Sequence, residues 1–145
     1  MEAAKRVLRY LRGTLHHGIS FSSGPLSLTA FSDANWAKDP TDRHSTIGLL
    51  VFLGPNHISW FAKKQPTVSR SSTEVECRAL ATFAAKLSWL RILVKELKIF
   101  LPYVPVIWCD NVSAITLSAN PAFHSRTKHL EVDYHYVREK VLRRD

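Results

Sequence analysis

The chain has 145 residues, of which 46% are hydrophobic, and its formal net charge is +8. This length suffices for one domain with a hydrophobic core, and the composition is that of a globular protein. There is no apolar run long enough to span a bilayer, and two cysteines are too few for a disulfide framework or a zinc site, which argues against membrane, disulfide-rich and structural-zinc proteins.

The basic excess favours a polyanionic partner such as nucleic acid. Part of this excess lies in two stretches near the ends, residues 5–12 and 138–144. A solvated basic surface is the alternative, since charge alone does not specify a ligand.

The first 25 residues predict a helix followed by a connector. Residues 3–12 form a charged amphipathic pattern that ends at Gly13, and residues 13–25 end in turn-forming residues. The pattern lacks the uninterrupted apolar core of a secretory signal, although an amphipathic, arginine-containing start is also compatible with organelle import. Together with Cys77 and Cys109, which we expect to be buried thiols in a reducing compartment, it favours an intracellular, non-secreted protein.

Three apolar runs predict strands joined by short turns. They cover residues 26–34, 46–53 and 57–62, and Gly54 and Pro55 between the last two are typical of a turn. Strands separated by short turns favour an antiparallel meander.

A long helix is expected next, capped by Ser71 or its neighbour, because Ser71 and Glu74 have the spacing of a capping box. The periodicity extends the helix to about Leu97. Its apolar stripe has steps of three and four residues and consists of Leu80, Phe83, Leu87, Leu90, Val94 and Leu97. Glu76 lies four residues before Leu80 on the same line, so we expect it to be buried. Glu74 lies off that line and is interpreted as a cap partner.

The last third of the chain contains patterns that predict a strand and two helices. Residues 105–109 predict the strand, and residues 111–119 and 126–142 predict the helices. The last helix has an apolar line of Leu130, Tyr134, Val137 and Val141. The whole order of elements indicates an α/β protein in which a mixed sheet carries packed helices.

Three carboxylates, Asp33, Glu76 and Asp110, occupy positions where burial is costly unless a cation or partner compensates their charge. If the first and fourth strands are neighbours, Asp33 and Asp110 lie side by side, and the start of the long helix can place Glu76 over them. Hard oxygen ligands favour Mg²⁺ or Mn²⁺. Two such ions can hold a phosphodiester for in-line attack, so we expect a two-ion nuclease site.

Each carboxylate also has a simpler structural interpretation. Asp110 could cap the helix that follows it, and Asp33 could close a turn with Asn35. Glu76 is harder to explain in this way, because it begins a buried stripe. Taken together, in this order of strands, the three residues favour a metal site.

The histidines and tryptophans are weaker signals. The run from His124 to His129 concentrates donors before a helix and could hold phosphates, or it could be a solvated loop. Histidines in such positions are typical of surface or capping residues. We expect the four tryptophans in or at the edge of the core, although Trp36, flanked by polar residues, could stack on a nucleotide.

Several long motifs in one order resemble the ribonuclease H domain of copia-type retrotransposon Pol polyproteins. The resemblance covers nearly the whole chain. Its motifs are residues 3–14, 32–37, 43–48, 58–60, 64–76, 109–115 and 120–129.

The resemblance implies Mg²⁺-dependent hydrolysis of the RNA strand of an RNA–DNA hybrid, with Asp33, Glu76 and Asp110 as catalytic metal ligands. It implies a ribonuclease H-like domain over residues 26–145, with three antiparallel strands and a parallel fourth. Residues 1–25 resemble the tether to reverse transcriptase, a domain of the same polyprotein and an expected partner. The implied location is a cytoplasmic particle or the nucleus, without a membrane.

A hybrid-binding surface would read shape, phosphates and 2′-hydroxyls rather than base sequence. The residues expected to make these contacts are Arg70, Asn111, Arg126, Lys128 and His129.

The sequence departs from the family at its end. The family continues with a fifth strand and a closing helix that carries a fourth catalytic aspartate, and Glu131, Asp133 and Asp145 do not match that motif. Loss of these elements would weaken one metal position and leave a sheet edge open. A catalytically inactive nucleic-acid-binding remnant of the same fold is therefore the main alternative, and a structural or protein-interaction module is the other.

Overall fold

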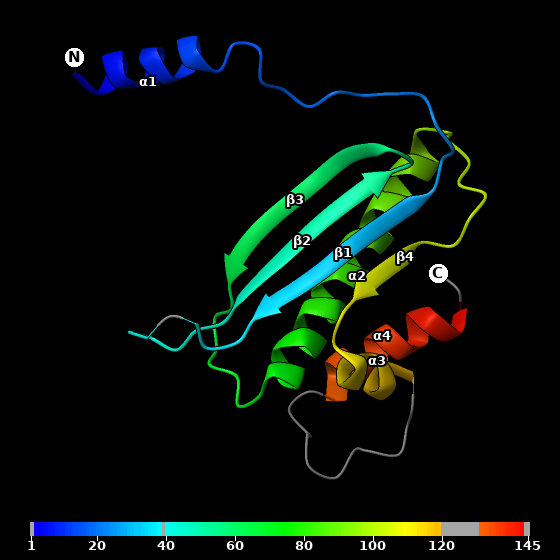
Figure 1. Ribbon diagram of the computed structural model, residues 1–145. Coiled ribbons are helices and arrows are strands. Elements are labelled where there is room, and N and C mark those ends of the chain that lie inside the picture. The colour runs from blue at the N-terminus through cyan, green and yellow to red at the C-terminus, as the bar shows by residue number, and fades with distance from the viewer. Residues whose placement is uncertain (1, 39, 120–130, 144–145) are drawn as a thin grey trace.

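The computed structural model describes an α/β protein in which one long helix packs on a four-stranded sheet (Figure 1). The described residues are 2–38, 40–119 and 131–143. In chain order the elements are α1 (Glu2–Gly13), β1 (Leu28–Asn35), β2 (Thr46–Leu53), β3 (Asn56–Lys64), α2 (Ser72–Glu96), β4 (Val106–Cys109), α3 (Val112–Ala119) and α4 (Glu131–Arg143).

The strand order in the sheet is β3-β2-β1-β4. The first three strands pair antiparallel through short turns, whereas β4 pairs parallel with β1 because the chain returns to the same end of the sheet through α2. The β1–β4 register places Ser32 opposite Cys109. This topology confirms the predicted fold class of three antiparallel strands and a parallel fourth.

Successive side chains along β1 point to opposite faces of the sheet. Leu28, Ala30 and Ser32 are buried towards α2, whereas Phe31 and Asp33 are exposed on the opposite face. The buried face packs on α2 to form the main core, which contains Leu28, Ala30, Ile47, Leu49, Val51, Val75, Ala79, Phe83, Leu87 and Leu90.

Helix α2 begins where its sequence predicts. The Ser71 side chain accepts a hydrogen bond of 3.2 Å from the backbone N–H of Glu74, which satisfies one of the free donors of the first turn. The predicted stripe is buried from Leu80 to Val94. The prediction is wrong for Leu97, which is 62% exposed because the helix ends at Glu96.

Helices α3 and α4 pack beside α2 and β4 (Figure 1). They bury a second cluster made of Cys77, Leu80, Ala81, Ala84, Ala114, Tyr134 and Val137. The predicted apolar line of the last helix is confirmed for Tyr134 and Val137 and wrong for Val141, which is 59% exposed, while Leu130 lies outside the described residues. Among the helices described, none combines the length and apolarity needed to cross a membrane.

Helix α1 lies apart from the sheet and buries none of its described side chains (Figure 1). The connector that follows reaches the domain at Ser22, whose N–H donates to Asn56 Oδ1 at 2.7 Å and whose carbonyl accepts from Asn56 Nδ2 at 2.9 Å. The proposed boundary between residues 1–25 and 26–145 stays a prediction.

The tryptophans were predicted in or at the edge of the core. None is buried in it, because all four side chains are about half exposed: Trp36, Trp60, Trp89 and Trp108. Trp60 and Trp108 alternate with inward-facing neighbours and lie with Phe31 on the face of the sheet opposite α2. Trp36 is held in place by a 3.0 Å hydrogen bond from its Nε1 to the Ser69 carbonyl.

Candidate metal centre

Glu76 lies in the second turn of α2 and is only 4% exposed. Its carboxylate accepts a hydrogen bond from the backbone N–H of Ala34 in β1 and lies 3.8 Å from the Cys109 thiol, which donates to Oε2. The predicted burial of Glu76 is therefore confirmed, and two strands of the sheet hold its side chain.

Asp110 follows the last residue of β4 and is exposed. It does not serve as the helix cap, because Asn111 Oδ1 accepts the hydrogen bond from the Ala114 N–H at 2.9 Å. Asn111 thus supplies the local structural role that Asp110 could otherwise have filled, which leaves the Asp110 carboxylate for another interaction.

One oxygen of Glu76, one oxygen of Asp110 and the sulfur of Cys109 lie within 4.8 Å of one another. The group found among the described residues does not include Asp33. Asp33 does not close a turn either, because β1 continues through Asn35 and pairs Asp33 with Gly48. The structure therefore brings two of the three predicted carboxylates into one group, and the third influences it through its charge.

Burial and the neighbouring carboxylates raise the pKa of Glu76. Burial is the largest cause, and the charges of Asp110 and then Asp33 add to it, so the pKa of Glu76 rises from 4.5 to about 7. The hydrogen bonds from Ala34 and Cys109 lower the same pKa and offset part of this rise. A divalent cation would compensate the crowded negative charge, and carboxylate oxygens are the ligands that Mg²⁺ and Mn²⁺ prefer, so the donor set fits such an ion.

Cys109 is a member of this group that its sequence pattern did not predict. It was expected to be an ordinary buried thiol, but it is half-buried, and its sulfur faces a carboxylate. Its position immediately before Asp110, at the end of a strand, was the available signal. Cys77 is buried as expected. Burial is also the main cause that raises the pKa of the Cys77 thiol, to about 11.

Glu74 forms a second acidic feature beside the centre. Its carboxylate accepts from the Arg70 backbone N–H at 2.9 Å and pairs with Arg78 at 2.8 Å. The predicted cap pairing with Ser71 is confirmed, but the burial of Glu74, which is 5% exposed, was not expected. The Arg78 guanidinium offsets that buried charge. Burial raises the pKa of the half-buried Asp133, and the charge of Arg78 offsets part of that rise.

Only two of the five residues predicted to contact a hybrid lie in the part of the chain that the structure describes. Arg70 is exposed near the start of α2, and Asn111 is half-buried at the cap of α3. The remaining three, Arg126, Lys128 and His129, lie outside the described residues.

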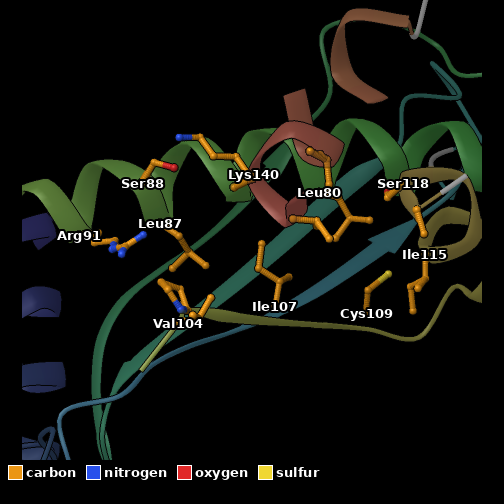
Figure 2. Close-up of a pocket in the computed structure, with 15 residues that line it drawn as sticks. Leu80, Leu87, Ser88, Arg91, Val104, Ile107, Cys109, Ile115, Ser118 and Lys140 are labelled. Carbon is orange, nitrogen blue, oxygen red and sulfur yellow. The ribbon is translucent and has the colours of Figure 1, made fainter. Parts of the chain in front are cut away.

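A cavity of about 330 Å³ lies between α2, β4, α3 and α4 (Figure 2). Its wall is mainly apolar and includes Leu80, Leu87, Ile107, Ile115, Val137 and Cys109. Arg91 and Lys140 are also among its lining residues. Such an apolar wall does not fit a cation, so the candidate metal centre is the carboxylate group and not this cavity. Cys109 belongs to both.

Fold and site together define an α/β protein with a candidate divalent-metal centre assembled from the start of a helix and the end of one strand. The chain is 52% identical over 142 residues to "Retrovirus-related Pol polyprotein from transposon RE1" of Arabidopsis thaliana. It is 54% identical over 140 residues to the corresponding polyprotein from transposon RE2 of the same organism. These alignments cover 97% and 96% of this chain but 10% of each relative, so the chain spans about a tenth of their length.

A third relative is shorter. "Secreted RxLR effector protein 161" of Plasmopara viticola is 43% identical over 98 residues, which are 67% of this chain and 69% of that protein. The chain belongs to the same family as these three proteins and is a homologue of a segment of retrotransposon Pol polyproteins. No family model and no solved structure matches it.

Proposed function

We propose that this chain is a ribonuclease H-type nuclease domain that hydrolyses the RNA strand of RNA–DNA hybrids with Mg²⁺ or Mn²⁺. The observation that carries the proposal is the meeting of Glu76 and Asp110, from α2 and the end of β4, with Asp33 near enough to raise the pKa of Glu76. The homology to retrotransposon Pol polyproteins supports it, because copying RNA into DNA produces such hybrids.

In this proposal Asp33, Glu76 and Asp110 hold the metal. When bound, such ions activate the attacking water and stabilise the leaving oxygen of the phosphodiester. The chain itself supplies position: the Ala34 N–H and the Cys109 thiol fix the Glu76 carboxylate, and the Asn111 cap fixes the backbone that follows Asp110. The exposure of Asp33 and Asp110 leaves the centre accessible to a substrate phosphate.

The net charge of +8 suits a polyanionic substrate. We assign the hybrid contact to Arg70, Asn111, Arg126, Lys128 and His129, and we propose the reverse transcriptase domain of the same polyprotein as the protein partner. An electrostatic contact of this kind must weaken steeply as salt rises, so hybrid affinity measured between 50 and 200 mM salt, in fluorescence anisotropy, should fall on the order of tenfold or more.

The decisive experiment is the Asp110→Asn substitution. Mg²⁺-dependent cleavage of the RNA strand should collapse, while hybrid binding should persist, because the change removes a metal ligand and leaves the basic surface intact. Asp42→Asn is the matched control, since Asp42 is an exposed aspartate paired with Lys64 at 3.0 Å. A wild-type chain that cleaves no hybrid at any Mg²⁺ or Mn²⁺ concentration would overturn the proposal.

One observation favours a second candidate, a catalytically inactive hybrid-binding domain of the same fold. Asp33 lies outside the group formed by the ligand atoms of Glu76, Cys109 and Asp110. Under this candidate, wild-type protein and Asp110→Asn bind hybrid equally, with the same salt dependence, and neither cleaves it.

A further inference from the structure

We propose that Cys109 makes this centre able to hold a thiophilic divalent cation, such as Zn²⁺, Co²⁺ or Cd²⁺, through its sulfur. The proposal rests on the metal centre of the proposed function and deepens it, because it concerns which ions the centre accepts. Thiolate ligands select such soft or borderline cations, whereas Mg²⁺ is bound by oxygen.

The spacing of the donor atoms supports a mixed oxygen and sulfur centre. The Cys109 sulfur and Glu76 Oε2 are 3.8 Å apart, and an oxygen of Asp110 completes the group within 4.8 Å. A shared ion would lie about 2.1 Å from the oxygen and about 2.3 Å from the sulfur. Because these two atoms are 3.8 Å apart, the oxygen–metal–sulfur angle would be about 120°. This angle is closer to that of tetrahedral coordination than to the right angle of octahedral coordination. Tetrahedral coordination is the geometry that zinc-like ions adopt in proteins.

A second observation at the same place is the Ser32 hydroxyl. Ser32 is 7% exposed, and its Oγ has no hydrogen-bond partner among the described residues. Ser32 is the register partner of Cys109, so the two side chains lie next to each other on the face that packs against α2. An unsatisfied buried hydroxyl is costly, and a metal-bound thiolate beside it would give this donor an acceptor.

The binding step is a simple exchange of a proton for a metal ion. In the structure the Cys109 S–H donates to Glu76, so the thiol proton occupies the position between the two ligand atoms. On metal binding the S–H bond breaks, a sulfur–metal bond forms, and the proton leaves to solvent. Neither the metal nor the sulfur changes oxidation state.

Cys77, the other thiol, provides a matched control. It is buried on α2 among Leu80, Tyr134 and Val137, and it is not a member of the ligand group. A sulfur signal that depends on Cys109 and not on Cys77 therefore reports this centre and not a general affinity of thiols for metal.

The test is titration of the metal-free full chain with Cd²⁺, followed by the sulfur-to-cadmium charge-transfer absorption in the near ultraviolet. One equivalent should saturate the signal in the wild type and in Cys77→Ser, and Cys109→Ser should abolish it. Asp110→Asn should lower the Cd²⁺ affinity at least tenfold, and Ser32→Ala should lower it about 10- to 100-fold, which is usual for groups that support a metal ligand.

Persistence of the absorption in Cys109→Ser, or its loss in a folded Cys77→Ser, would overturn the proposal. Asp110 is exposed, so Asp110→Asn provides a readout even if Cys109→Ser does not fold, and an unchanged Cd²⁺ affinity in that variant would also overturn it. Mg²⁺-dependent hybrid cleavage by the wild type is measured separately. Cleavage without a sulfur signal contradicts this inference alone, whereas a sulfur signal without cleavage contradicts the proposed function alone.

Discussion

The carboxylates of Glu76 and Asp110 meet in one group although they come from a helix and from the end of a strand that follows it. The charge of Asp110 is the second cause, after burial, of a Glu76 pKa of about 7. The centre is therefore a place where the fold tolerates electrostatic cost, as metal-binding and catalytic sites commonly do.

The first prediction concerns the pH dependence of stability without metal. Native Glu76 keeps its proton up to about pH 7, whereas an unfolded glutamate loses it near 4.5, so stability falls as pH rises through this window and the loss is complete above it. At pH 8 the loss is on the order of 3 kcal/mol. Glu76→Gln should therefore be more stable than the wild type at pH 8 and about equal to it at pH 4.

Urea unfolding with a chelator present, at pH 4 and pH 8, measures this difference. Glu96→Gln, at the exposed end of α2, is the control and should differ little from the wild type at both pH values. The same gap between Glu76→Gln and wild type at the two pH values would show that Glu76 does not titrate in this window.

The second prediction concerns the core. Phe83 is 0% exposed and packs edge-on against Phe61 with 5.6 Å between ring centroids, so Phe83→Ala should cost about 3–5 kcal/mol in the free energy of unfolding. Phe100 is 79% exposed, and Phe100→Ala should change the free energy of unfolding by about 0.5 kcal/mol or less. Chemical denaturation of both variants checks this, and equal costs would contradict the packing of α2 on the sheet.

The third prediction concerns the start of α2. Ser71→Ala removes the acceptor of the Glu74 N–H and should lower stability by about 1 kcal/mol. Ser72, the next residue, begins the helix and is exposed, so Ser72→Ala should be nearly neutral. Thermal unfolding of the two variants distinguishes them, and the reverse order of stability would place the cap at Ser72.

The fourth prediction concerns α1. Because α1 buries none of its described side chains, deletion of residues 2–13 should change the free energy of unfolding by about 0.5 kcal/mol or less. Asn56→Ala is a useful comparison, because it removes both hydrogen bonds to Ser22. A deletion that lowers stability by several kcal/mol would show that α1 packs on the domain in solution.

Local patterns were sufficient to predict most of the fold. The three meander strands, the Ser71 cap and the stripe from Leu80 to Val94 depend on neighbouring residues, whose periodicity specifies the element and its buried face. The burial of Glu76 followed from the same stripe.

The placement of Asp33 depended on information that a single strand does not contain. Whether Ser32 or Asp33 faces α2 is decided by register, and a shift of one residue reverses every side chain of the strand. The exposure of the tryptophans has a related reason: a strand residue such as Trp60 or Trp108 is buried in the core only if a helix covers its face, and α2 covers the other one.

The parallel pairing of β4 with β1 has a consequence for how the protein reaches its native state. This pairing joins the two strand segments that are most distant along the chain, so the entropic cost of closing the loop between them is the largest in the sheet. Asp110 directly follows β4, whose place beside β1 is established by this closure. A chain in which β4 is not yet paired would therefore lack the complete candidate centre, and occupancy by the proposed metal would report that folding is finished.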